Sequence, residues 1–167
     1  MKRILLLTTG GTIASRMTEE GLAPGMDGDM LAHYMGGLAG SYDLTVKDIL
    51  HLDSSNIQPE EWKLIASHVY KAREEYDGVV ISHGTDTMAY TASVLSYMVR
   101  NIPIPVVLTG AQLPIEHPLT DGLDNLLVLF RIRGTAPHDR GRAVSSDRSR
   151  IYHLPSQCDA PFLRGLE

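Results

Sequence analysis

Short apolar runs alternate along this chain with longer segments in which apolar residues recur every three or four positions. Runs of the first kind are typical of buried strands, and segments of the second kind are typical of helices with one apolar face. The clearest helix starts at Pro59, because proline favours a first helical turn and Trp62, Ile65 and Val69 recur on one face. The predicted strands lie at residues 3–9, 44–52, 79–81 and 106–109. The predicted helices lie at residues 26–38, 59–76, 86–99 and 121–132.

This alternation determines the fold class that we expect. Strand–helix–strand units favour right-handed connections and a parallel sheet. We therefore predict an α/β domain over residues 1–133, with a parallel sheet flanked by helices on both faces in a Rossmann-like three-layer arrangement. From residue 134 onward neither period is visible, so residues 134–167 are predicted to form an irregular tail. The only apolar cluster in that tail is short and lies around Ile151.

Composition and charge narrow the class of protein. Hydrophobic residues make up 43% and charged residues 21%, the balance of an ordinary soluble domain, and the net charge of -5 does not favour a nucleic-acid partner. A single cysteine, Cys158, excludes an intrachain disulfide and suits a reducing compartment. The apolar run Ile4–Leu7 is too short for a signal peptide or a membrane span. We therefore expect a cytoplasmic protein with no membrane partner.

A polar segment follows each of the predicted strands. In a parallel sheet the carboxyl ends of the strands meet at one edge, and small ligands bind there. The four segments therefore predict a small-molecule site at this edge of the sheet. They are Thr8–Thr12, Asp53–Asn56, Ser82–Thr87 and Thr109–Gln112.

Each of these segments has a structural interpretation beside the chemical one. Thr12 follows two glycines and offers a hydroxyl, but such a turn is also typical of a hydrogen-bonded threonine or a phosphate cradle. Asp86 could hold a hydroxyl or an ammonium group, or it could cap the helix at residues 86–99. Asp53 could bind a ligand or cap the helix that starts at Pro59.

The histidines and the cysteine do not indicate a metal site, a histidine base or a serine or cysteine nucleophile. His83 is interpreted as a packed or hydrogen-bonded residue rather than a base. The seven histidines and the cysteine show no metal-ligand spacing, and no Gly-x-Ser-x-Gly or Cys–His nucleophile pattern is present. We predict neither a metal nor a cofactor.

Two segments resemble the signature motifs of the bacterial asparaginase family. They are TTGGTIA at residues 8–14 and GVVISHGTDTM at residues 78–88. LDSSN at 52–56 and PEEW at 59–62 are similar to the substrate loop and helix of its cytoplasmic type I branch. The resemblance continues with LTGAQLP at 108–114, TDG at 120–122 and NL at 125–126. On these residues the chain is identified as the N-terminal domain of a type I L-asparaginase, and the resemblance covers residues 3–133.

The resemblance implies hydrolysis of L-asparagine to L-aspartate and ammonia. Thr12 would attack the side-chain amide and form an acyl-enzyme. Thr85 would help to remove the hydroxyl proton of Thr12, together with Asp86 and a lysine further along the chain.

The resemblance also implies how the substrate is held. Asp86 would hold the α-ammonium group, and backbone N–H groups near Thr12 and Ala111 would form an oxyanion hole. The full-length family assembles as homodimers or homotetramers. The implied substrate-binding residues are Asp53, Ser54, Ser55, Thr85, Asp86 and Ala111.

The chain departs from the family after the helix at 121–132. No lysine occurs after Lys71, and arginine does not replace it because arginine stays protonated. Residues 134–167 are expected to lack the strand that the family has there, although residues 151–153 slightly resemble it. The second domain that the resemblance implies is expected to be absent. We therefore expect residues 134–167 to be a truncated or frame-shifted end.

Two other functions stay open at this point. One is the glutamine-hydrolysing subunit of a tRNA-dependent amidotransferase, which shares these motifs. The other is a catalytically impaired fragment that retains at most the binding of an amino acid.

Overall fold

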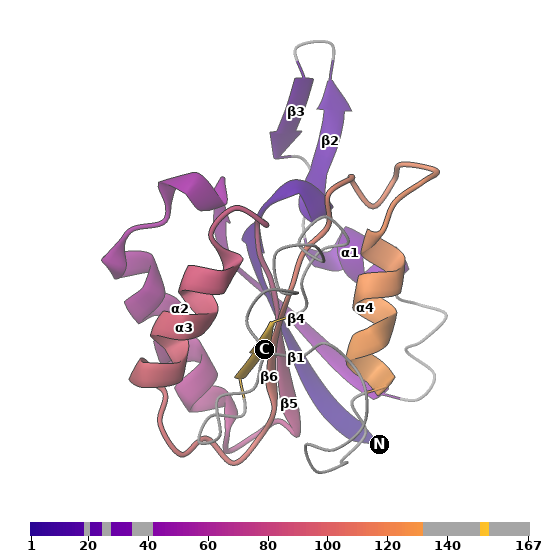
Figure 1. Ribbon diagram of the computed structural model, residues 1–167. Helices are drawn as coiled ribbons and strands as arrows, with labels where there is room; N and C mark the ends of the chain where they lie inside the picture. Colours follow the sequence, from indigo (N-terminus) through magenta and orange to yellow (C-terminus); the bar gives the residue numbers. More distant parts are fainter. Residues whose placement is uncertain (19–20, 25–27, 35–41, 132–150, 154–167) are drawn as a thin grey trace, which may run out of the picture.

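The computed structural model describes residues 1–18, 21–24, 28–34, 42–131 and 151–153. In these residues a central sheet of five parallel strands has the order β4-β1-β5-β6-β7, and a separate antiparallel hairpin pairs β2 with β3. The hairpin projects beyond the sheet (Figure 1). The strands are β1 (Lys2–Gly10), β2 (Ser15–Thr18), β3 (Gly21–Pro24), β4 (Tyr42–Leu52), β5 (Gly78–Ser82), β6 (Val106–Thr109) and β7 (Ile151–His153).

Helices cover both faces of the sheet, as the sequence predicts. Helices α2 and α3 lie on one face, and α1 and α4 lie on the other (Figure 1). The predicted helix at 26–38 is described only in part, because residues 25–27 and 35–41 lie outside the described residues. The helices are α1 (Gly28–Tyr34), α2 (Pro59–Ala72), α3 (Met88–Met98) and α4 (Gly122–Arg131), with short 3-10 turns η1 (Thr12–Ala14) and η3 (Ser54–Asn56).

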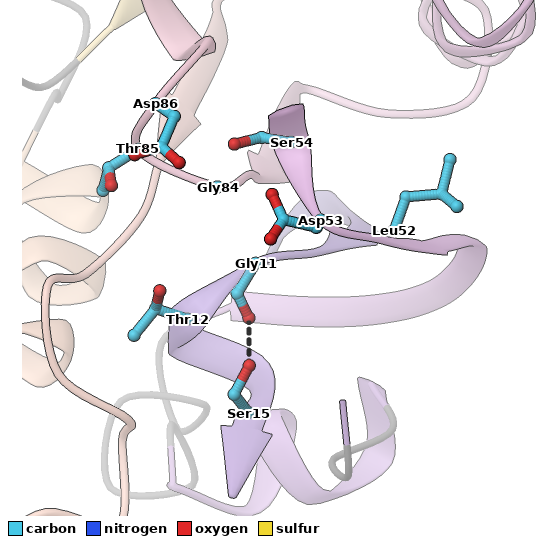
Figure 2. Close-up of a pocket in the computed structure, with 9 residues that line it drawn as sticks. All are labelled: Gly11, Thr12, Ser15, Leu52, Asp53, Ser54, Gly84, Thr85 and Asp86. Atoms are coloured by element: carbon cyan, nitrogen blue, oxygen red, sulfur yellow. Dashed lines mark hydrogen bonds between the residues drawn. The ribbon is translucent and has the colours of Figure 1, made fainter. Parts of the chain in front are cut away.

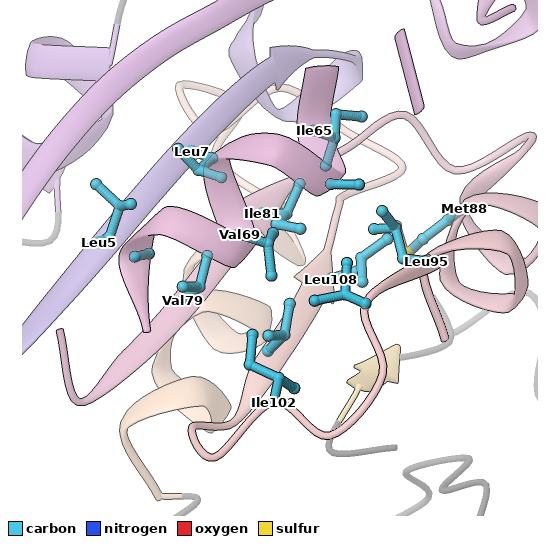
Figure 3. Packing of buried hydrophobic residues seen from close by; sticks show 14 residues of the cluster. Leu5, Leu7, Ile65, Val69, Val79, Ile81, Met88, Leu95, Ile102 and Leu108 are labelled. Carbon is cyan, nitrogen blue, oxygen red and sulfur yellow. The ribbon is translucent and has the colours of Figure 1, made fainter. Parts of the chain in front are cut away.

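The pleat of β1 divides the core into two layers. Leu5 and Leu7 pack under α2 and α3, whereas Leu6, between them, packs under α1 and α4. The larger layer joins the apolar face of α2, including Ile65 and Val69, to β5, β6 and α3 (Figure 3). Both clusters are buried against the sheet, which positions the loops at its edge.

Strand order places a topological switch point between β1 and β5. From β1 the chain moves to β4 on one side, and from β4 it returns across to β5 on the other side. The connection after β1 leads to α1 on one face of the sheet, and the connection after β5 leads to α3 on the other face. In such sheets a ligand crevice forms at this point.

One connection contradicts the expectation that every strand–helix–strand unit is right-handed. The units β5–α3–β6 and β6–α4–β7 step in the same direction across the sheet, yet α3 and α4 lie on opposite faces. The last unit therefore has the opposite hand from the one before it. Leu126 of α4 packs with Leu6 and Val80 on that face, beside Leu31 of α1.

A second correction concerns the predicted irregular tail. Residues 151–153 form β7, which pairs in parallel with β6, so the expectation that no strand follows residue 133 is wrong here. Ile151 and Tyr152 are residues that favour a strand, and β6 offers them a backbone edge to pair with. The rest of residues 134–167 lies outside the described residues.

Candidate active site

A cavity of about 150 Å³ opens at the switch point, where β1, β4 and β5 end. Its volume is below the range of roughly 300–1,000 Å³ typical of sites for drug-sized ligands, so it suits a smaller solute. Figure 2 shows its lining from three loops. The lining residues are Gly11, Thr12, Ser15, Leu52, Asp53, Ser54, Gly84, Thr85 and Asp86.

Two glycines allow the three loops to meet. Gly11 has φ +82, and a Cβ on it would lie 2.5 Å from the backbone nitrogen of Gly84. A Cβ on Gly84 would in turn lie 2.6 Å from the Cβ of Ser54. The backbones after β1 and β5 are thus in direct contact, and the Ser54 side chain of the β4 loop packs against Gly84. A side chain at either glycine would push these loops apart.

An irregularity in β4 brings the third loop to the cavity. Thr8 pairs with Asp48 and Gly10 pairs with Leu52, so β1 advances by two residues while β4 advances by four. Such a bulge bends the strand and redirects the residues that follow it. The Gly11 N–H then donates to the Leu52 carbonyl at 3.3 Å, which holds Asp53 beside the β1 loop.

The hydroxyls of Thr12 and Thr85 differ from those of nearby threonines. Thr9 donates to the Ser82 carbonyl and Thr87 donates to the Ser54 carbonyl, each at 2.8 Å. Thr12 and Thr85 are half-buried and make no side-chain hydrogen bond within the part of the chain that the structure describes. In Figure 2 the Thr12 hydroxyl is directed toward the loop that carries Thr85. Both hydroxyls are therefore available to a bound molecule.

Two carboxylates make the cavity electrically negative. Asp53 and Asp86 line it, and its lining includes no cationic side chain among the described residues. The pKa of Asp53 lies below its usual value because the Ser55 backbone N–H donates to the carboxylate at 2.9 Å, and the Ser55 hydroxyl adds a second bond at 2.8 Å. Asp53 therefore stays ionised to a lower pH than an ordinary aspartate. This charge disfavours a phosphate cradle and favours a cationic group on the ligand.

The capping interpretation of Asp86 is wrong. Helix α3 starts at Met88 with Thr87 at the N-cap, so Asp86 precedes the cap and is exposed. The capping interpretation of Asp53 needs a similar correction. Asp53 caps the short turn η3, whereas the N-cap of α2 is Gln58, whose N–H donates to the Glu61 carboxylate at 2.7 Å.

Comparison with known proteins places this geometry in a family. The family described as Asparaginase, N-terminal, matches residues 3–151 of the chain. The chain belongs to the asparaginase family. The match includes both motif segments that supply the cavity loops, and it extends beyond residue 133.

Three relatives illustrate the similarity of this asparaginase-family chain. The L-asparaginase of Thermococcus kodakarensis is 50% identical over 125 residues, which cover 74% of this chain and 38% of that protein. The crystal structure of L-asparaginase I from Vibrio cholerae has a TM-score of 0.67 at 36% identity, and covers 77% of this chain and 39% of that one. A subunit of the glutamyl-tRNA(Gln) amidotransferase of Thermoplasma acidophilum is 38% identical over 152 residues, covering 89% of this chain and 36% of that protein. The chain spans less than half the length of each.

The structure brings together five of the residues singled out in the sequence. Ser55 is exposed and acts on Asp53 rather than lining the cavity. Ala111 is 1% exposed and also lies outside the lining. The roles of both as substrate contacts stay predictions. The five that line the cavity are Thr12, Asp53, Ser54, Thr85 and Asp86.

Sequence reasoning missed Ser15 in this asparaginase-family site. The turn η1 folds the chain back after Thr12, so Ser15 returns to the cavity and its hydroxyl donates to the Gly11 carbonyl at 3.0 Å. The spacing of three residues from Thr12 is one 3-10 turn, and it is the signal that could have indicated this position.

His83 is buried and neutral beside the site. Its Nδ1 lies 2.7 Å from the Gly84 carbonyl, which only accepts, so Nδ1 carries the proton. Desolvation lowers the pKa of His83, and the bond to Gly84 opposes this only in part. The histidine thus packs under the Gly84 loop, as the sequence interpretation expects.

No metal site or membrane span is found in the described ranges. No group of three His, Cys, Asp or Glu side chains is arranged there to hold a metal ion. The helices of the same ranges are too short or too polar to cross a bilayer.

The two bonds from Ser55 make a prediction about charge in the site. In a Ser55→Ala variant the backbone bond to Asp53 remains and the hydroxyl bond is lost, so the pKa of Asp53 should rise part of the way to its ordinary value. The carboxylate would then become protonated at a higher pH as the solution is acidified. An NMR titration of the Asp53 carboxyl carbon measures this shift. Ser67→Ala, whose hydroxyl bonds only within α2, is the control and should leave the titration unchanged. An unchanged Asp53 titration in Ser55→Ala would contradict the assignment.

Proposed function

We propose that this chain carries the active site of an amidohydrolase that converts L-asparagine and water to L-aspartate and ammonia. The observation that supports the proposal most strongly is a pair of hydroxyls, Thr12 and Thr85, that line one small cavity and bond no other described side chain or backbone group. Membership of the asparaginase family and 50% identity to an L-asparaginase support the substrate.

The charges of the cavity match the ends of an amino acid. Asp53 and Asp86 would attract the α-ammonium group, because a charge-assisted hydrogen bond is stronger than a neutral one. Ser54 is 3% exposed and lies in the lining, where its hydroxyl can bond a carboxylate or amide. The side-chain amide would then extend toward Thr12 and Thr85.

The reaction follows from the two threonines. The Thr12 oxygen attacks the amide carbon, while its proton passes by way of Thr85 toward Asp86. The amide nitrogen takes a proton and leaves as ammonia, which breaks the C–N bond and leaves an ester on Thr12. Water then attacks the ester, so that aspartate is released and the Thr12 hydroxyl is restored. Backbone N–H groups of the turn at Thr12 would stabilise the negative oxygen of each tetrahedral intermediate.

The resemblance also supports a compartment and an oligomeric state for this activity. We place the protein in the cytoplasm, where a lone cysteine stays reduced. We expect assembly as a homodimer or homotetramer in the full-length family. Nucleic acid is not an expected partner of the site, since its cavity is negative.

Two alternatives are supported by specific observations. The 38% identity to a subunit of a glutamyl-tRNA(Gln) amidotransferase favours glutamine as the amide substrate. The absence of lysine after Lys71 favours an impaired site, because the family uses such a lysine in proton transfer.

An ammonia-release assay separates these three functions. The purified chain is supplied with L-asparagine and L-glutamine in parallel, and we expect release from asparagine in excess. Preference for glutamine would support the second function. Binding of L-aspartate without turnover of either amide would support an impaired site.

The role of Asp86 gives a further prediction. An Asp86→Asn variant should weaken binding of L-aspartate by roughly tenfold to a hundredfold, the range expected for one lost charge-assisted hydrogen bond. Isothermal titration calorimetry measures the dissociation constant without requiring turnover. Asp124→Asn, an exposed aspartate on α4, is the matched control. Equal affinity of both variants would exclude Asp86 from ammonium recognition.

A further inference from the structure

The carboxylate of Asp48 lies outside the cavity and connects β4, β1 and the start of α1. Asp48, on β4, accepts the hydroxyl hydrogen of Thr8 on β1. It also accepts the backbone N–H of Gly28, at 3.0 Å to one carboxylate oxygen and 3.2 Å to the other. Gly28 is the first residue of α1. The side chain of Asp48 on β4 therefore bonds both to β1 and to the first residue of α1, the helix that follows the β2–β3 hairpin.

The contact requires the residues that are present. A Cβ on Gly28 would lie 2.7 Å from the Asp48 carboxylate, so glycine is what allows the backbone to approach. Thr8 is 4% exposed and Asp48 is exposed, so the bond between them is partly buried. The carboxylate also lies at the start of α1, where the helix dipole favours negative charge.

Asp48 lies on β4 immediately before the irregular pairing that leads to the cavity, so its bond to Thr8 affects the two cavity loops. Thr8 and Asp48 are the last regular pair before the irregularity that ends at Gly10 and Leu52. The chain reaches Thr12 four residues after Thr8, and it reaches Asp53 five residues after Asp48. A change in the Thr8–Asp48 pairing would therefore alter the separation of the two cavity loops.

The segment between Thr12 and Gly28 is tied at both ends. At its start the Ser15 hydroxyl donates to the Gly11 carbonyl, and at its end Gly28 donates to Asp48. The hairpin of β2 and β3 lies between these two ties. Asp48 thus holds the start of α1, where the segment that begins at Thr12 comes back to the sheet.

We propose that Asp48 is a positioning residue for the active site. It fixes the spacing between the loop of Thr12 and the loop of Asp53 and Ser54, and it acts through Thr8 and Gly28 without contacting the substrate. Its effect on turnover rests on the proposed function. Its effect on the two loops does not.

The test compares Asp48→Ala and Asp48→Asn with Asp43→Ala. Asp43 is an exposed aspartate on the same strand, opposite Arg3, and serves as the matched control. Hydrogen exchange is followed at Gly28 and over residues 11–14, the dissociation constant for L-aspartate is measured by calorimetry, and kcat and KM are measured with L-asparagine. Asp48→Asn keeps an acceptor oxygen and guards against a variant that does not fold.

In Asp48→Ala we expect exchange at Gly28 and over residues 11–14 to become about tenfold faster, as loss of a hydrogen bond to a charged group would cause. We expect L-aspartate affinity to fall and KM to rise, with Asp48→Asn intermediate and Asp43→Ala unchanged. A residue that only stabilises the fold would lower kcat through the active fraction and leave KM unchanged.

Two outcomes would overturn the proposal. One is faster exchange at Gly28 with no change over residues 11–14, which would make Asp48 a helix cap only. The other is unchanged affinity and KM in Asp48→Ala. If the unmodified chain neither binds L-aspartate nor releases ammonia, the proposed function fails, and exchange over residues 11–14 still decides whether Asp48 positions the loop.

Discussion

Replacing Thr12 with alanine is expected to lower kcat for L-asparagine by at least about 10³-fold, because loss of a nucleophile removes the covalent route altogether. The fold should be little affected. Thr12 is half-buried, and its hydroxyl makes no hydrogen bond to the residues that the structure describes. The ammonia-release assay measures kcat, and thermal unfolding shows that the variant is folded.

Two control variants test whether the loss of turnover is specific to the Thr12 hydroxyl. Thr12→Ser keeps a hydroxyl at the same position and should retain measurable turnover. Thr45→Ala removes an exposed threonine of β4 and should behave as the unmodified chain does. Unchanged ammonia release in Thr12→Ala would remove Thr12 as the nucleophile.

Gly11→Ala is expected to cause the largest loss of stability among the site variants. Alanine at φ +82 is strained, and its Cβ would lie 2.5 Å from the Gly84 nitrogen, which belongs to backbone and does not rotate away. Strain and overpacking together should lower the free energy of unfolding by about 2–4 kcal/mol. Urea denaturation measures this change, and L-aspartate binding should be lost with it.

Gly78 provides the matched control for this substitution. A Cβ on Gly78 would first meet the end of the Ile4 side chain, at 3.3 Å, and Gly78 has no positive φ. Gly78→Ala should therefore cost less, because a flexible side chain can move aside. Equal stability of Gly11→Ala and the unmodified chain would show that the three loops are not in contact as described.

Much of the fold could be predicted because its signals are local. The strand predicted at 106–109 is found with those bounds, and the helix that starts at Pro59 is α2. Burial repeats every second residue in a strand and about every 3.6 residues in a helix, so the order of residues records both elements. The polar segments after β1, β4 and β5 were located for the same reason.

The capping of helices was harder to predict. Asp86 had the residue type of an N-cap, yet α3 begins two residues later. Asp53 caps η3 instead of α2. Several nearby polar residues could cap each helix, and the packing of the loops determines which one does.

The amino-acid sequence by itself predicted β1, β4, β5, β6 and the four helices, and it predicted that hydroxyls and carboxylates follow these strands. It did not predict the β2–β3 hairpin or β7. The tertiary structure alone decided that Ser15 lines the cavity and that Ala111 lies outside its lining. It also decided that α4 packs on the same face of the sheet as α1. These features depend on which strands pair, on the irregularity in β4, and on how closely Gly11 approaches Gly84. Each joins residues far apart in the chain, so no local pattern of hydrophobic and polar positions records it.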